Sequence, residues 1–409
     1  MKFDIFFSIC QSKVDGVIPS EAKMFENFFS QIKLADKLGF ENAWVAEAHL
    51  STEVQKENKN PVVPNFEGEI GLNTDIFQLA HKVFSMTENI NIGSAIMNLL
   101  SNGGPIARAE QTLSFLALHG ADKEEKRKLN LGFASGRFPY QISPYGIKPR
   151  NDFEESIWPI LKGKVFQQSS ELFLRLLKGE KISSKDLSKM SLCKSDFRDE
   201  KSLKKARDAY RELYSRQMPS ELELESYFDF EQLKIVPNSY NPDLLNLYMG
   251  SHDPKAVKLA NSHLPCRVFN LSITPKEVIE QTHQDMLEIY HKDGGPWQRD
   301  MMPQTLMVFV NDDKNLTPKE KNTKAREQAL KAMASYWNAM QGTVDKEKLE
   351  KAVDNTLCGS PEKIAEQIRE NYHPEDRIML WFDFNNHNNK EVESMMRIFK
   401  ERVMPLCEG

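Results

Sequence analysis

Short runs of apolar residues recur along the chain and are separated by longer, mostly polar stretches. Their apolar residues are continuous rather than alternating, which is typical of parallel strands because helices cover both faces of such a sheet. Nearly every run is followed by residues with helical periodicity, so the pattern consists of repeated β-α units. The eight runs lie at residues 3–9, 42–47, 90–97, 129–134, 244–250, 266–271, 305–310 and 377–384.

Eight β-α units in a chain of 409 residues predict an α/β protein with a closed (β/α)8 barrel, the TIM-barrel fold. A doubly wound open sheet is the alternative. Four of the expected helices have a clear start signal, in which a polar capping residue precedes a proline. These pairs are Asp253-Pro254, Thr274-Pro275, Thr317-Pro318 and Ser360-Pro361, and Glu277 and Glu320 would complete capping boxes in the middle two.

The segment 178–231 does not fit the repeated pattern. It is rich in Lys, Asp and Glu and contains a single glycine, Gly179. We interpret it as an insertion after the fourth β-α unit, within one domain that spans residues 1–409. Its charges indicate a solvated face, or else a lid or a partner surface. One amphipathic helix is expected in it, with an apolar face made by Leu203, Ala206, Tyr210 and Leu213.

Composition narrows the class of protein. The chain has 40% hydrophobic and 28% charged residues and a net charge of -5, which gives no basic excess for binding nucleic acid. The N-terminal residues read as a first strand rather than a signal peptide, and no apolar run is long enough to span a membrane. The cysteines are odd in number and have no C-x-x-C pairing, which favours reduced thiols and a cytoplasmic protein: Cys10, Cys193, Cys266, Cys358 and Cys407.

The end of the second apolar run carries the first candidate chemistry. The stretch NAWVAEAHL, residues 42–50, places Glu47 and His49 where the strand should end. In a (β/α)8 barrel the active site is built at this end of the strands. We expect Glu47 at the rim as an orienting carboxylate and His49 in the mouth, where a neutral imidazole can exchange protons near neutral pH. The alternative is that backbone groups or an arginine hold Glu47 and that His49 lines a loop.

Two further strand ends predict a phosphate site. The fourth run leads into a turn of small residues with one arginine and one tyrosine, and small residues let a flat ligand approach the backbone. The fifth run leads into a helix start whose N–H groups and hydroxyl can bind an anion. The residues concerned are Ala134, Ser135, Gly136, Arg137 and Tyr140 in the first turn and Met249, Gly250, Ser251 and His252 in the second.

These motifs together resemble a known family, the luciferase-like flavin-dependent monooxygenases. The resemblance covers most of the chain outside the charged segment and depends on the order and spacing of the motifs. They are WVAEAHLS at 44–51, IGSAIM at 92–97, PIARAEQTLSFL at 105–116, LNLGFASGRFP at 129–139, YFDFEQLKIVP at 227–237 and LYMGSHDPKAVKLA at 247–260, with CGSPEKIAEQI, RIMLWFDF and VMPL near the end.

The resemblance implies an FMN-dependent monooxygenase that uses reduced flavin and O2 to oxygenate a small organic substrate, such as an aldehyde or a natural-product intermediate. A separate flavin reductase would supply the reduced FMN, and the chain would form a homodimer. Ser94, Ala95 and Ile96 would lie along the flavin ring, with a cis peptide between the last two. Ala134 would touch the ring, and Ser251 with its neighbours would hold the phosphate.

Two positions depart from the family pattern. Bacterial luciferase has two adjacent histidines after the glutamate, and here the first is Ala48. The arginine that usually precedes the glycine after the fourth strand is Ser135, and Arg137 follows that glycine instead. The change to Ala48 favours a non-catalytic alternative, a flavin-storing protein or a partner subunit. A deazaflavin-dependent oxidoreductase is a further alternative, because the resemblance implies a family in which some members use that cofactor.

Two other features complete the predicted site. No set of His, Asp and Glu has the spacing of a zinc or iron site, so we expect no metal. A polar loop at residues 385–389 follows the last run and would lie at the barrel mouth, either as a plain surface loop or in contact with flavin or substrate.

Overall fold

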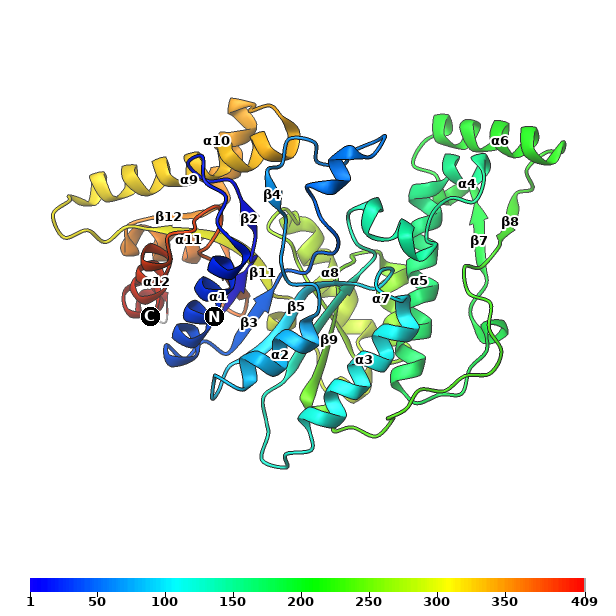
Figure 1. Ribbon diagram of the computed structural model, residues 1–409, viewed down its shortest axis with the longest axis horizontal. Helices are drawn as coiled ribbons and strands as arrows, with labels where there is room; N and C mark the ends of the chain where they lie inside the picture. Colours follow the sequence, from blue (N-terminus) through cyan, green and yellow to red (C-terminus); the bar gives the residue numbers. More distant parts are fainter. Residues whose placement is uncertain (408–409) are drawn as a thin grey trace.

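The computed structural model describes residues 1–407, so the last two residues of the single domain expected over 1–409 lie outside it. Its centre is a nine-stranded parallel sheet in the order β10-β9-β6-β5-β3-β1-β13-β11-β12, flanked by helices (Figure 1). The strands are β1 (Lys2–Phe7), β3 (Asn42–Val45), β5 (Asn91–Asn98), β6 (Leu129–Ala134), β9 (Leu245–Met249), β10 (Cys266–Val268), β11 (Gln304–Val310), β12 (Leu357–Gly359) and β13 (Arg377–Trp381).

All eight predicted strands are confirmed, and β12 is the additional one. It pairs with β11 only at Val308–Val310, whereas β13 pairs with the earlier residues Gln304–Met307 of the same strand. At the other end of the sheet, the Asn270 N–H donates to the Pro303 carbonyl, and the Thr305 N–H donates to the Asn270 carbonyl. These bonds connect the segment after β10 to the start of β11, on the far side of the sheet order.

Helices cover the outer face of the sheet. Three predicted caps are confirmed, since the side chains of Asp253, Thr317 and Ser360 each accept a backbone N–H, and Thr317 forms the capping box with Glu320. The helices are α1 (Glu21–Lys37), α2 (Ile76–Phe84), α3 (Gly104–His119), α4 (Asp152–Ser156), α5 (Trp158–Leu177), α6 (Glu200–Tyr214), α7 (Pro254–Asn261), α8 (Lys276–Ile289), α9 (Pro318–Gln341), α10 (Lys346–Asp354), α11 (Pro361–Asn371), α12 (Asn389–Ile398) and α13 (Met404–Cys407).

The predicted cap at Thr274 is wrong. Helix α8 begins at Lys276 with Pro275 in the capping position, and no side chain caps it. The Thr274 hydroxyl instead accepts the backbone N–H of Leu271, three residues earlier. Because this oxygen closes the preceding turn, the capping box with Glu277 does not form.

The inner face of the sheet carries an apolar cluster and, next to it, a polar layer. In the polar layer, Arg377 and Asn42 both donate to one oxygen of the buried Asp4 carboxylate at 2.8 Å, and Trp44 donates to the other at 2.9 Å. We call the apolar group the inner cluster; it consists of Phe6, Trp44, Tyr248, Phe269 and Met379, with Ala46, Ala95, Ile96 and Trp381 packed against it and partly exposed.

The segment 178–231 lies outside the main sheet, at one end of the molecule (Figure 1). It contains an antiparallel pair, β7 (Met190–Cys193) and β8 (Glu221–Leu224), and the predicted amphipathic helix, which is α6. Leu203, Ala206 and Tyr210 of α6 are buried, but Leu213 is 46% exposed and does not belong to the apolar face. A second small pair joins β2 (Gln11–Ser12) to β4 (Gly68–Glu69). No helix within residues 1–407 has the length and apolarity of a membrane span.

Candidate functional site

Glu47 and His49 follow β3 and form a buried charged group with an arginine from α3. The Nε2 atom of His49 lies 2.7 Å from Oε1 of Glu47, and Nη2 of Arg108 lies 2.8 Å from the same oxygen. The Arg108 nitrogen is also 3.0 Å from the His49 Nε2 atom. We call these three residues the Glu47 triad.

Nε2 of His49 faces a hydrogen-bond acceptor, Oε1 of Glu47, and a donor, Nη2 of Arg108. Its role in the two contacts depends on the tautomer of the ring. In the tautomer with the hydrogen on Nε2, this atom donates to Glu47, and Nδ1 is the nitrogen that can take a proton. Arg108 balances the charge of Glu47, while the second carboxylate oxygen, Oε2, has no hydrogen-bond partner.

The expected position of Glu47 at the rim is wrong, because its side chain is fully buried, and His49 is only 5% exposed. The structure instead agrees with the alternative in which an arginine holds Glu47. Sequence reasoning missed Arg108, although a signal was present. Arg108 lies on the buried face of α3 with Pro105, Thr112 and Leu116, where an unpaired arginine is very costly.

Two residues predicted to contact the flavin ring, Ile96 and Ala134, lie beside Gly250 of the predicted phosphate turn. A Cβ atom on Gly250 would lie 2.5 Å from Cδ1 of Ile96 and 3.1 Å from Cβ of Ala134. The Ala95-Ile96 peptide is cis, as predicted. The register between β5 and β6 shifts from Ser94 to Met97, and such an irregularity redirects side chains at this edge. The result is a small-residue cradle that a flat ring can approach closely.

The predicted phosphate turn after β9 is largely used by its own hydrogen bonds. The Ser251 hydroxyl accepts the N–H of Asp253, and the Asp253 carboxylate accepts the N–H of Lys255 as the cap of α7. His252 is turned toward β10, with Nε2 2.7 Å from Oδ1 of Asn270. Ser251 therefore remains the residue of this turn that is best placed to donate to an anion.

The turn after β6 brings in a lysine that the sequence did not indicate. Nζ of Lys162, from α5, donates to the carbonyl of Gly136 at 2.5 Å, and burial lowers the pKa of this lysine. Arg137 is exposed and lies over the ring of Phe138 at 5.4 Å rather than over the turn. Tyr140 also points away, with its hydroxyl 3.4 Å from Thr52. Lys162 is thus a cation held at the turn after β6, which belongs to the predicted phosphate site.

A carboxyl group after β13 was not predicted as part of the site. Oδ2 of Asp383 accepts the N–H of Ser8 at 3.4 Å and its hydroxyl at 3.3 Å. Burial raises the pKa of Asp383 to about 6. Asp383 drew no separate attention in the sequence because it lies near the end of an apolar run and its partner, Ser8, is 375 residues away along the chain.

Buried polar atoms without a hydrogen-bond partner collect at this edge of the sheet. Within the described residues they include Oε2 of Glu47, Oγ of Ser94, Nδ2 of Asn98, Nε of Arg108, Nε1 of Trp381 and Oδ1 of Asp383. Each such atom costs about 1 to 3 kcal/mol unless something binds it. An isoalloxazine ring carries both donors and acceptors along its edge, so this set of atoms fits a flavin bound beside the small-residue cradle.

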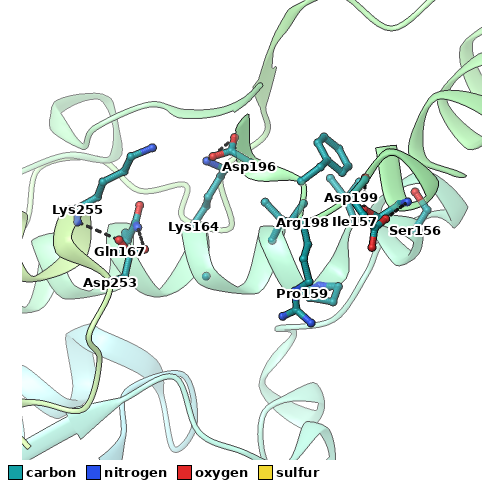
Figure 2. Close-up of a pocket in the computed structure, with 14 residues that line it drawn as sticks. Ser156, Ile157, Pro159, Lys164, Gln167, Asp196, Arg198, Asp199, Asp253 and Lys255 are labelled. Atoms are coloured by element: carbon teal, nitrogen blue, oxygen red, sulfur yellow. Dashed lines mark hydrogen bonds and ion pairs between the residues drawn. The ribbon is translucent and has the colours of Figure 1, made fainter. Parts of the chain in front are cut away.

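A separate cavity of about 570 Å³ lies between α5, residues 196–202 and the start of α7 (Figure 2). Lys164 pairs with Asp196 across it at 3.1 Å, and Gln167 donates to Asp253 at 3.1 Å. None of the site residues predicted from the sequence lines this cavity. It touches the predicted site only through Asp253, the cap of α7.

The sequence matches no family model and no curated protein. The structure is similar to monooxygenase RslO1 from Streptomyces bottropensis, with a TM-score of 0.65, 14% identity and 99% of each chain covered.

Two further structures bear on the cofactor. One is a type II Baeyer-Villiger monooxygenase, the oxygenating constituent of 3,6-diketocamphane monooxygenase from Pseudomonas putida, in complex with FMN, with a TM-score of 0.56, 13% identity and coverage of 99% of this chain and 98% of the other. The other is an F420-dependent secondary alcohol dehydrogenase, with a TM-score of 0.54, 13% identity and the same coverage. At this level of identity the similarity establishes the fold: the chain shares the α/β fold of solved flavin monooxygenases and of an F420-dependent enzyme over nearly its whole length.

Proposed function

We propose that the protein is an FMN-dependent monooxygenase that uses reduced flavin and O2 to oxygenate a small organic substrate, of the aldehyde or natural-product type. The observation that carries this proposal is the meeting of Ile96, Ala134 and Gly250 next to buried, unpartnered polar atoms. We further infer that eight strands form a closed (β/α)8 barrel, since Asn270 joins the end of β10 to β11, with residues 178–231 inserted into it.

The flavin ring would rest on the partly exposed residues of the inner cluster, from Ile96 across to Trp381. Ser94 and Asn98 offer buried donors at one side of this platform. The phosphate would lie between the turns after β6 and β9, where the Ser251 hydroxyl and the Lys162 ammonium can donate to it. When bound in its reduced form, FMN would supply the electrons for oxygen chemistry at this position.

In the proposed reaction, the Glu47 triad would accept a proton on His49. In the tautomer whose Nε2 donates to Glu47, the Nδ1 atom of His49 would accept a proton, and the buried carboxylate would stabilise the imidazolium that results. Arg108 orients Glu47 and keeps its charge balanced. A non-catalytic flavin-storing protein is the less favoured alternative, because it would not need His49 beside the proposed flavin position.

A deazaflavin-dependent oxidoreductase is the second candidate. It is favoured by the similarity to the F420-dependent dehydrogenase, which covers the chain as fully as the FMN-containing structure does. In that case the same cradle would hold a deazaflavin ring. A separate flavin reductase and a homodimeric state belong to the FMN proposal only as expectations from the resemblance.

The deciding experiment has two steps. The purified protein is titrated with FMN and with F420, followed by flavin fluorescence. It is then mixed with FMN, NADH, a flavin reductase and a panel of aldehydes and ketones, and oxygenated products are identified by mass spectrometry with ¹⁸O2. Incorporation of label into a product supports the FMN proposal. Tight binding of F420 with no binding of FMN would overturn it in favour of the second candidate.

A further inference from the structure

Asp383 follows two residues after β13 ends, close to the inner cluster. Met379 and Trp381 of that strand share one face, and the Trp381 side chain interacts with the Asp383 carboxyl. The first belongs to the inner cluster and the second packs against it. Phe6 of the inner cluster lies on the neighbouring strand β1. Ser8, which directly follows β1, donates to Asp383.

No cation neutralises Asp383 among the described residues, because none of the ion pairs includes it. The other titratable group that faces it is the Cys10 thiol, whose pKa burial raises to about 12, so it carries no charge. Within residues 1–407, its carboxylate accepts the Ser8 N–H and hydroxyl at long distances, and the Trp381 side chain lies near enough to lower its pKa, while Oδ1 is buried without a hydrogen-bond partner. The Glu47 triad, in contrast, contains its own cation.

We propose that Asp383, in its protonated form, donates a hydrogen bond through Oδ1 to an acceptor on the ring of the bound flavin, and so serves as a second proton-carrying residue of the site. This inference rests on the proposed function. The two carboxyl groups then differ in protonation state. Glu47 stays ionised because it has a fixed counter-ion, whereas Asp383, which has none, can hold a proton. If the proton passes to the acceptor, the O–H bond breaks, Asp383 becomes a carboxylate, and solvent returns the proton.

The test compares FMN binding by the wild type and by Asp383→Asn across the pH range from about 5 to about 8. The asparagine amide can donate at every pH, whereas Asp383 loses its donor as the pH rises through about 6. The ratio of the two dissociation constants, wild type over variant, should therefore rise by about fivefold to tenfold with pH. Taking the ratio cancels the titration of the FMN phosphate itself, whose second pKa is also about 6.

A second measurement needs no flavin. Infrared difference spectra of the protein alone should show the carbonyl stretch of a protonated carboxyl at low pH, and Asp383→Asn should lack it. In Ser8→Ala the carboxylate loses a donor, so both this band and the change in FMN affinity should persist to higher pH. This variant also keeps the proposal testable if Asp383→Asn does not fold.

The outcomes separate the two proposals. A wild-type protein that binds no FMN at any pH overturns the proposed function and this inference together. A protein that binds FMN with a ratio independent of pH overturns the role of Asp383 alone, as does the absence of the infrared band at low pH.

Discussion

Arg108 donates to the Glu47 carboxylate at 2.8 Å from a helix that begins 57 residues after that glutamate, and both side chains are completely buried. A buried ion pair of this kind holds two elements in one relative position, since neither charge can remain without the other. The strand end after β3 and the helix α3 are therefore fixed to each other at the point where His49 is oriented.

Replacing Arg108 by methionine should lower the free energy of unfolding by about 3 to 5 kcal/mol, because Glu47 is left as an unpaired buried charge. Urea unfolding followed by circular dichroism measures this. The exposed pair Lys189 and Glu223 provides the control, since Lys189→Met should change stability by less than about 1 kcal/mol. Adding Glu47→Gln to Arg108→Met should recover part of the loss; a double variant that is less stable than the single one would contradict the account.

Gly250→Ala should weaken FMN binding by at least about tenfold while the protein still folds. The new methyl group would fall 2.5 Å from Ile96 and push that side chain into the space proposed for the ring. The measurement is an FMN titration by fluorescence. Gly163→Ala is the matched control, since nothing lies within 4 Å of its added Cβ, and it should bind as the wild type does.

Ser251→Asp should place a negative charge against the proposed phosphate and reduce FMN affinity by about tenfold or more. Riboflavin, which has the same ring without phosphate, is the control ligand. Its affinity should change little in the variant. If both ligands lose affinity equally, the turn after β9 supports the ring and the phosphate lies elsewhere.

His49→Ala should leave FMN affinity nearly unchanged but lower substrate oxygenation by about 100-fold, since proton transfer by a placed side chain contributes about 10²- to 10⁴-fold. The readout is product formed per reduced flavin consumed in a single turnover, with the hydrogen peroxide yield measured in parallel. His81→Ala, an exposed histidine on α2, is the control. Equal coupling in wild type and His49→Ala would show that this residue only packs the loop.

Asp383 should make stability depend on pH. Its pKa in the folded protein is raised from 3.8 to about 6, so the folded state binds the proton more tightly than the unfolded state. The resulting stability is present below the unfolded pKa and is lost as the pH rises through the folded pKa. Relative to Asp383→Asn, the free energy of unfolding of the wild type should thus fall by about 2 kcal/mol between about pH 4 and about pH 7.5. This is somewhat less than the whole pKa shift would give, because the side chain keeps some solvent contact. Urea unfolding of both proteins at the two pH values tests this, and a constant difference would refute it.

What the sequence predicted correctly was mostly local. The eight strands were recognised because parallel strands covered on both faces are continuous apolar runs, and α6 because its buried residues recur with helical spacing. Strand β12 was missed because three residues do not form a recognisable run. The cap at Thr274 was wrong because its hydroxyl has a competing local partner.

The site was predictable only in part, for a different reason. Glu47 and His49 are two residues apart, so their contact could be read from a short motif. Arg108, Lys162 and Asp383 reach the site from helix α3, from helix α5 and from the segment after β13. Their partners are set by how the strands and helices pack, and a single sequence contains no direct record of that packing.

The pairing of Asp4 with Arg377 has a consequence for synthesis of the chain. The first strand lies between β3 and β13, and its buried carboxylate is 373 residues away from the guanidinium that neutralises it. While the ribosome is still making the C-terminal part, β1 has one open edge and an uncompensated internal charge. Strand β1 therefore cannot complete its pairing until nearly the whole chain has emerged. A chain that stops before Arg377 leaves one edge of β1 exposed to chaperones and proteases.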